Sequence, residues 1–400
     1  MPVPAERAVI VGALRTPYGS RGGALAGWHP VDLSARVLDA LVETCALAPA
    51  LVDRVIWAAH SQVGAQAANV GRRSVLAAGW PETVPAATID AHGASSLEAV
   101  LAATESVLRK GARVVVAGGV ELASAVPLGA ALAQPAVGRP MGARLAERYR
   151  AEGGMAPPGL VAEHLAASRE LSRRQLDDWA IASVQRALAC AGTASDHLVS
   201  VGPVQKEPSG AVLGKGRKRP IRPPVPCDEA LVAPMSPSAV RALPPAYLEG
   251  GVVTAANFAL EGDGAAAVAV TTSSFARANG LRPLAAVLGC GRSGCSPTLW
   301  PLAATGATRA ALDMAGLSPA EIGWWRVLES SAAAAIAWGE DMGVKDLNPG
   351  GGELATTCPL GAAGAGMLAS ALGGGGITGK AVVAAAGELG VGAACIIEPA

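Results

Sequence analysis

The sequence predicts an α/β fold made of two similar halves, with a further segment inserted between them. Short apolar runs alternate along the chain with stretches of helical periodicity, an arrangement that favours βαβ units and a mainly parallel sheet. Most of these runs are apolar throughout, as strands covered on both faces are. Two stretches of the first third recur in the same order near the end of the chain, which indicates an internal duplication.

The expected elements of the first half follow one another as strand and helix. A β-rich run at 8–17 ends in a turn, and the helical stretch at 32–49 has Asp32 as its expected N-cap. The remaining expected elements are strands at 54–60, 84–90 and 112–121 and a helix at 95–111.

Two pairs of segments carry the internal similarity. "CALAPALVDRVIW" at 45–57 lines up with "AGLSPAEIGWWRV" at 315–327, and 111–121 resembles 379–390. The alternative is coincidence in an alanine-rich chain, but the shared order and near-constant spacing favour a duplication. We therefore expect a first half at 1–122 together with 249–272, an inserted loop domain at 123–248, and a second half at 273–400.

The inserted segment differs from its surroundings in composition. It is richer in Pro, Arg and Met, and one helix is expected in it at 172–192. A basic run in this segment is either a solvated loop or a loop that contacts phosphate groups, because guanidinium and ammonium groups suit nucleotide phosphates. The run consists of Lys215, Arg217, Lys218, Arg219 and Arg222.

Charge and cysteine usage narrow the functional classes. The 400 residues include 32 Lys and Arg and 32 Asp and Glu, so no overall field favours a nucleic acid or membrane partner. The start of the chain is unlike a signal peptide, and no apolar stretch reaches membrane-spanning length. The seven cysteines are scattered without a CxxC pair, so we expect reduced thiols in a cytoplasmic protein and no metal site.

Six segments resemble the thiolase family, and together they extend over essentially the whole length. They are "AVIVGALRTPYGSRGGAL", "GRRSVLAAGWPETVPAATID", "VVVAGGVELASAVP", "GGVVTAANFALEGDGAAAVAV", "RPLAAVLG" and "ATRAALDMAGLSPAEI". The resemblance implies a thiolase fold of five αβαβα layers, with two five-stranded halves and a loop domain that binds coenzyme A. It also implies a homodimer or tetramer, and an acyl thioester of CoA or of a carrier protein as substrate, with no tightly bound cofactor.

The resemblance also implies a mechanism. In the family a cysteine at a helix N-terminus takes the acyl group, a histidine activates it, and a second cysteine moves the α-proton. Backbone N–H groups and a water held by an asparagine stabilise the oxyanions. The physical basis is general, because a helix N-terminus and an adjacent base stabilise a thiolate, and preorganised donors stabilise an oxyanion.

This sequence departs from the family motifs at each reactive position. In "GASSLEA" Gly93 takes the place of the nucleophilic cysteine, and in "TCPLGAAG" Cys358 takes the place of the histidine. "AGELGVG" begins at Ala386 instead of the second cysteine, and "ESSA" places Glu329 at the asparagine position. Ala259 aligns with a serine near the pantetheine arm. Because catalytic groups of this kind act as a unit, ordinary thiolysis is not expected.

Two hypotheses remain for chemistry at such a site. Cys358 and His92 could form a pair with exchanged places and carry an acyl group; the alternative is that both are buried structural residues. In the second hypothesis, carboxylates do acid–base work on an acyl thioester, as in a retro-aldol reaction, dehydration or decarboxylation. Its residues are Glu329 and Glu388, with Ser95 beside them.

The sequence thus leaves two functions open. One is an enzyme that performs acyl transfer or Claisen-type C–C chemistry on an acyl thioester with a non-standard site. The other is a catalytically inactive thiolase-like subunit that stabilises an active partner. We favour the enzyme, because polar groups and Cys358 are expected in the vacated site instead of bulky apolar side chains.

Overall fold

The structure is a computed structural model, and part of the chain is described. The described residues are 6–109, 111–133, 138, 140–152, 155–191, 196–201, 225–374 and 377–400. The basic run predicted either as a solvated loop or as a phosphate-contacting loop lies outside these ranges; it consists of Lys215, Arg217, Lys218, Arg219 and Arg222.

One continuous sheet runs through both halves in the order β4-β3-β5-β6-β1-β7-β10-β9-β8, and the short β2 (Gly19–Ser20) pairs with β6. The two halves join where Val9 and Ile10 of β1 pair with Ala286 and Ala285 of β7. The strands are β1 (Ala8–Arg15), β3 (Val52–Ala58), β4 (Ala86–Ile89), β5 (Val114–Leu122), β6 (Gly262–Thr272), β7 (Ala285–Gly294), β8 (Trp324–Val327), β9 (Ala381–Gly387) and β10 (Val391–Pro399).

The strand order confirms the two similar halves. The path β3-β5-β6-β1 of the first half is mirrored by β8-β9-β10-β7 of the second. The repeated segments fall at equivalent places, since the first pair leads into β3 and β8 and the second forms β5 and β9.

Two expectations about the sheet are wrong. Among the strand pairs that the structure describes, only β3–β4, β3–β5 and β8–β9 are parallel, so the sheet is mixed and not mainly parallel. The reason is that β6 and β10 return antiparallel beside β5 and β9. Within the described residues the second half contributes four strands to the path instead of five, because no strand corresponds to β4.

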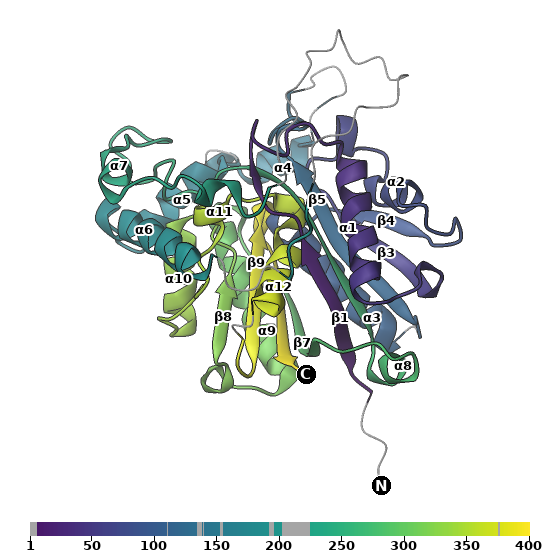
Figure 1. Cartoon of the computed structure of the whole chain (residues 1–400). Helices are drawn as coiled ribbons and strands as arrows, with labels where there is room; N and C mark the ends of the chain where they lie inside the picture. The colour runs from purple at the N-terminus through teal and green to yellow at the C-terminus, as the bar shows by residue number, and fades with distance from the viewer. Residues whose placement is uncertain are drawn as a thin grey trace.

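The helices form layers on and between the two halves of the sheet (Figure 1). α3 and α12 pack against each other in the centre, enclosed by strands of both halves, while α1 and α2 cover the outer face of the first half and α9 and α10 that of the second. This is the expected αβαβα arrangement. The bounds are α1 (Pro30–Thr44), α2 (Val70–Ala77), α3 (Ser95–Arg109), α9 (Ala303–Ala315), α10 (Ala332–Met342) and α12 (Ala363–Gly373).

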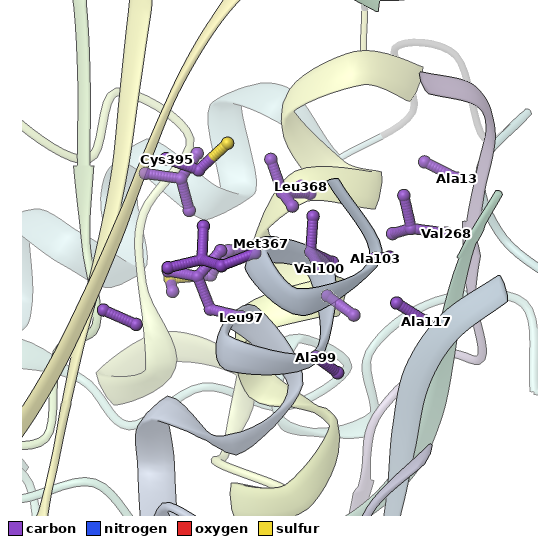
Figure 2. Close-up of a cluster of buried hydrophobic side chains, with 14 of the residues drawn as sticks. Ala13, Leu97, Ala99, Val100, Ala103, Ala117, Val268, Met367, Leu368 and Cys395 are labelled. Atoms are coloured by element: carbon purple, nitrogen blue, oxygen red, sulfur yellow. The ribbon is translucent and has the colours of Figure 1, made fainter. Parts of the chain in front are cut away.

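Alternation along the strands divides the apolar side chains between these layers. In β1, Ile10 packs in the central cluster while Val9 and Val11 face α1, as expected when successive side chains point to opposite faces. Figure 2 shows the central cluster, in which Leu97 and Val100 of α3 lie beside Met367 of α12. Cys395 of β10 is fully buried there and is a core residue.

The expected helix at 32–49 begins earlier than its pattern indicated. Its N-cap is His29, whose ring accepts a hydrogen bond from the N–H of Val31, and Pro30 opens the helix. Asp32 lies in the first turn and is not the cap. Proline favours the first helical position because its φ is already helical and the missing N–H has no partner there.

The inserted segment lies against the second half. Leu165 and Leu176 pack against the alanines of α10. A capping box of Ser172 and Gln175 begins the expected helix, which confirms it at nearly the predicted bounds. Its helices are α4 (Ala143–Arg148), α5 (Pro158–Ser168), α6 (Arg173–Cys190) and α7 (Pro237–Ala242); α8 (Ser273–Ala278) and α11 (Glu353–Thr356) follow outside it. Among the described residues, no helix is long and apolar enough to cross a bilayer.

A buried carboxylate at the start of β6 predicts a pH dependence of stability. Burial raises the pKa of Asp263 to about 6, although Ser124 donates hydrogen bonds to it from its N–H (2.9 Å) and its hydroxyl. Because ionisation is unfavourable in the folded state, stability should fall as the pH rises from about 4 to about 6, by on the order of 2–3 kcal/mol. Asp263→Asn keeps the size of the side chain and removes this dependence.

The test is denaturant unfolding of the wild type and of Asp263→Asn between pH 4 and pH 8. The variant should match the wild type near pH 4 and exceed its stability above pH 6. Parallel stability curves for the two proteins would contradict this assignment.

Candidate active site

The turn that leads from β4 into α3 is held by one serine. Ser95, fully buried at the first position of α3, accepts a hydrogen bond from the N–H of Ala91 (2.7 Å) and donates one to the carbonyl of His92 (2.5 Å). The turn therefore has a fixed shape, and Gly93 is buried within it. Ser95, expected among the catalytic residues, has the contacts of a residue that positions the turn.

No room remains beside Gly93 for a side chain. A Cβ atom at this position would lie 2.8 Å from the carbonyl oxygen of Ala386 and 2.8 Å from a methyl carbon of Leu328. Leu360 adds a further methyl carbon at 3.6 Å. The expectation of polar groups in place of apolar side chains is therefore wrong at this point, because two leucines line the vacated position.

Glu329 does not reach this position, since the side chain that contacts it belongs to the preceding residue, Leu328. The Glu329 carboxylate is fully buried and accepts hydrogen bonds from Asn348 (2.8 Å), Ser183 (2.6 Å) and Trp179 (3.2 Å). Burial raises its pKa despite these bonds. These contacts join α6 to the second half and are those of a structural residue.

Cys358 and His92 have different surroundings. Cys358 is buried in the central cluster. Burial raises the pKa of its thiol well above the ordinary value, and the carboxylates of Glu353 and Glu121 raise it further. Among the described residues no hydrogen bond joins it to His92, whose ring lies beside His60 and Asp90. The exchanged Cys–His pair stays a prediction, and these surroundings do not favour it, because burial disfavours the thiolate and the imidazole contacts His60 and Asp90.

Three side chains converge instead into what we term the His–Asp–His cluster: His60, Asp90 and His92. The two ring centroids are 4.6 Å apart. The Nδ1 atoms of His60 and His92 lie 3.4 and 3.9 Å from Oδ1 of Asp90. The side chains of His60, His92 and Asp90 are 14%, 18% and 34% exposed, so the cluster is open to solvent on one side.

The fold places each member of this cluster at the end of a strand. His60 follows β3 and Asp90 follows β4, and these strands are parallel neighbours, so their carboxyl ends meet at one edge of the sheet. His92 has a φ of +53°, a conformation that non-glycine residues seldom adopt and that is found where surrounding contacts enforce it. The N–H of His92 donates to Oδ1 of Asp90 at 2.8 Å.

A buried carboxylate holds the loop that carries His60. Glu121, 3% exposed at the end of β5, accepts hydrogen bonds from the N–H groups of His60 (2.9 Å), Ser61 (3.1 Å) and Gly361 (3.1 Å). The amide of Gln66 donates to it at 2.8 Å. Each carboxylate oxygen thus receives two donors, which ties the His60 loop to the loop after Cys358.

The surroundings shift the pKa values of the two histidines in opposite directions. Burial and the neighbouring His60 lower the pKa of His92 to about 4. Burial also acts to lower the pKa of His60, but the contact with Asp90 and the nearby carboxylates outweigh it, so this pKa is raised. Burial raises the pKa of Asp90 less than the two histidines lower it.

Glu388 lies next to the cluster. It begins the turn after β9, where Gly387 packs so closely that an added Cβ would lie 2.9 Å from Cβ of His92. Burial raises the pKa of Glu388. The charge of His60 lowers this pKa, the charge of Asp90 raises it, and the net shift is upward. Of the predicted site residues, His92 belongs to this cluster, and Glu388 directly follows Gly387, the residue that packs against His92. Glu329 contacts residues of α6, and Cys358 lies in the central cluster.

Sequence reasoning missed His60 and Asp90. A signal was present, because both residues end apolar runs that were correctly predicted as strands. Ala259, a predicted cofactor-binding position, is partly buried against the central cluster, and its N–H donates to the carbonyl of Ser330 at 3.0 Å.

Comparison with known proteins agrees with the fold. Residues 8–274 match the model of the thiolase N-terminal domain, and residues 281–399 match that of the thiolase C-terminal domain. The chain is 32% identical over 384 residues to a steroid 3-ketoacyl-CoA thiolase of Mycobacterium tuberculosis, covering 92% of this chain and 87% of that protein. It is 33% identical over 372 residues to an acetyl-CoA acetyltransferase of Paracoccus denitrificans, covering 90% and 91%.

A solved structure shows the same arrangement. The acetyl-CoA acetyltransferase of Bacillus anthracis superposes with a TM-score of 0.85 at 28% identity, over 99% of each chain. The chain belongs to the thiolase family.

Proposed function

We propose that this protein binds an acyl thioester, such as an acyl-CoA, and acts on it without forming a covalent acyl-enzyme at residue 93. The packing of Gly93 carries the proposal, because this position has neither a nucleophile nor the space for one. The substrate class follows from family membership, since the named relatives include 3-ketoacyl-CoA thiolases and acetyl-CoA acetyltransferases.

Without a nucleophile, the accessible reactions are those that move a proton or break a C–C bond beside the thioester carbonyl. The resemblance places Ala386 of β9 where the family's second cysteine is implied to move the α-proton, and Glu388 lies two residues further along, in the turn that follows β9. We assign the α-proton to Glu388, since a carboxylate in a partly apolar site suits this step. Proton abstraction, retro-aldol cleavage and decarboxylation all proceed through the enolate that this step or its equivalent produces.

A second candidate function is an inactive subunit that stabilises an active thiolase-family partner. The apolar contacts of Leu328 and Leu360 beside Gly93 favour it. One measurement separates the two functions, namely whether the isolated protein carries out chemistry on a thioester.

The first experiment follows acyl-CoA thioesters in deuterated water. The wild type should exchange the α-protons and show no acyl adduct by intact mass. Glu388→Gln should lower the exchange rate by about 100-fold or more, as loss of a general base does. Cys358→Ser and the exposed control Glu249→Gln should keep the wild-type rate.

Two outcomes would contradict the proposal. An acyl adduct that is lost in Cys358→Ser would establish covalent catalysis from that position. Thioester binding without exchange or cleavage of any substrate would leave the inactive subunit as the better account.

A further inference from the structure

We propose that the His–Asp–His cluster binds one divalent transition-metal ion, with Zn²⁺ as the expected ion. Each of the three side chains offers one ligand atom, and these atoms all lie within 4.8 Å of one another. Within the described ranges this is the one group of three or more such side chains that meets that condition. His60 and Asp90 are 30 positions apart in the chain, so it is the fold that brings them together.

The separations fit coordination to a shared ion. Two ligand atoms at about 2.1 Å from Zn²⁺ and at a tetrahedral angle lie about 3.4 Å apart. The distance from Nδ1 of His60 to Oδ1 of Asp90 is 3.4 Å, and that from Nδ1 of His92 is 3.9 Å. The separation of the two histidine ligand atoms is within 4.8 Å, so rotation of the side chains would bring the three atoms toward one ion.

Contacts behind the ligands hold their orientation. Glu121 fixes the backbone at His60, and the N–H of His92 orients Oδ1 of Asp90 at 2.8 Å. Ser95 locks the turn that carries His92. No hydrogen bond from the described part of the chain reaches Oδ2 of Asp90, so this atom is available to a metal. Such outer contacts are typical of metal sites.

The donor set indicates the kind of ion and its role. Two imidazoles and one carboxylate suit Zn²⁺ and related first-row metals better than Mg²⁺ or Ca²⁺. Three protein ligands leave a coordination position for water or substrate, as in catalytic zinc sites. The partial exposure of the cluster leaves that position accessible.

This inference deepens the proposed function and rests on it for its chemical meaning. A cation here would lie near the turn that carries Glu388, because Gly387, the residue before it, packs against His92. It would polarise the thioester carbonyl and stabilise the enolate oxygen as the α-proton leaves, a role that needs no covalent step.

The test measures metal binding directly. The full-length protein is stripped with a chelator and titrated with Zn²⁺ by calorimetry, and bound metal is counted by mass spectrometry. Co²⁺ absorption reports the coordination geometry. One ion per chain is expected, with binding weakened about 100-fold or more in His60→Ala/His92→Ala and in Asp90→Asn. His164→Ala, at an exposed histidine of α5, is the matched control and should bind as the wild type does.

Circular dichroism and thermal unfolding of each variant separate loss of ligands from loss of fold. Asp90→Asn keeps the shape of the side chain, so it serves if the double variant fails to fold. Absence of stoichiometric binding in the wild type, or equal binding in the folded ligand variants, would overturn the metal site.

The metal and the proposed function can fail separately. Metal-free protein that still exchanges α-protons would overturn the role of the ion and leave the function standing. Stoichiometric metal with no chemistry on any thioester would leave the site standing and reject the function.

Discussion

Glu121→Gln is expected to lower the free energy of unfolding by about 2–4 kcal/mol, although the two side chains are nearly the same size. Glu121 is buried, and each of its oxygens accepts two hydrogen bonds. Glutamine replaces one oxygen by an NH₂ group, which would face two donors of the surrounding loops. Leaving buried donors unpaired costs about 1–3 kcal/mol each, and bonds to a charged acceptor are the stronger ones.

The measurement is denaturant unfolding, with Glu43→Gln as the matched control. Glu43 is exposed near the end of α1, so its variant should change stability by less than about 0.5 kcal/mol. Glu121→Gln should also weaken Zn²⁺ binding by about 10–100-fold, because the His60 loop loses its anchor. Equal stabilities of the two variants would show that the four hydrogen bonds contribute little.

The sequence predicted the elements well because their signals are local. Continuous apolar runs identified the strands on either side of α3, and the short connections between them limited the alternatives. The duplication was visible because a loop and the strand after it are preserved together in each half, as at Pro49 and Pro319. These features depend on residues that are close in the chain.

Strand direction was not predictable in the same way. An apolar run indicates that a strand is buried on both faces, and it does not identify its neighbours. β6 is such a run, but it returns after a long insertion and pairs antiparallel with both β5 and β1. The connection that determines its direction therefore lies outside the pattern that predicts the strand.

The site was predicted only in part, because its residues come together through contacts between segments that are distant in the chain. The departure from the family's reactive residues is a prediction from motifs, and it stays a prediction; the structure adds that Gly93 is buried. The sequence did not show which side chain would fill the space beside Gly93. Leu328 contacts Gly93, whereas the adjacent Glu329 binds residues of α6. His60 and Asp90 meet because β3 and β4 are paired, and that pairing appears only in the folded chain.

Restoring the family's nucleophile should fail for a steric reason. Gly93→Cys places a Cβ atom 2.8 Å from both a backbone oxygen and a leucine methyl, well inside van der Waals contact. We expect a loss of about 1–3 kcal/mol in stability, as for other overpacked positions, and no acyl adduct on incubation with acyl-CoA. Gly350→Ala, where an added Cβ meets nothing within 4 Å, is the control and should be close to neutral.

A double-mutant cycle with Leu328→Ala separates the two contacts. Leu328→Ala alone should cost about 2–5 kcal/mol, because it removes a buried leucine. In the Gly93→Cys background its cost should be smaller by about 1 kcal/mol or more, since it removes one of the two clashes. The carbonyl of Ala386 belongs to the backbone of β9 and cannot be removed in this way, so the double variant should remain less stable than Leu328→Ala. Additive costs would show that Leu328 does not clash with the new side chain. A fully stable Gly93→Cys that takes up an acyl group would show that this position has room for a nucleophile.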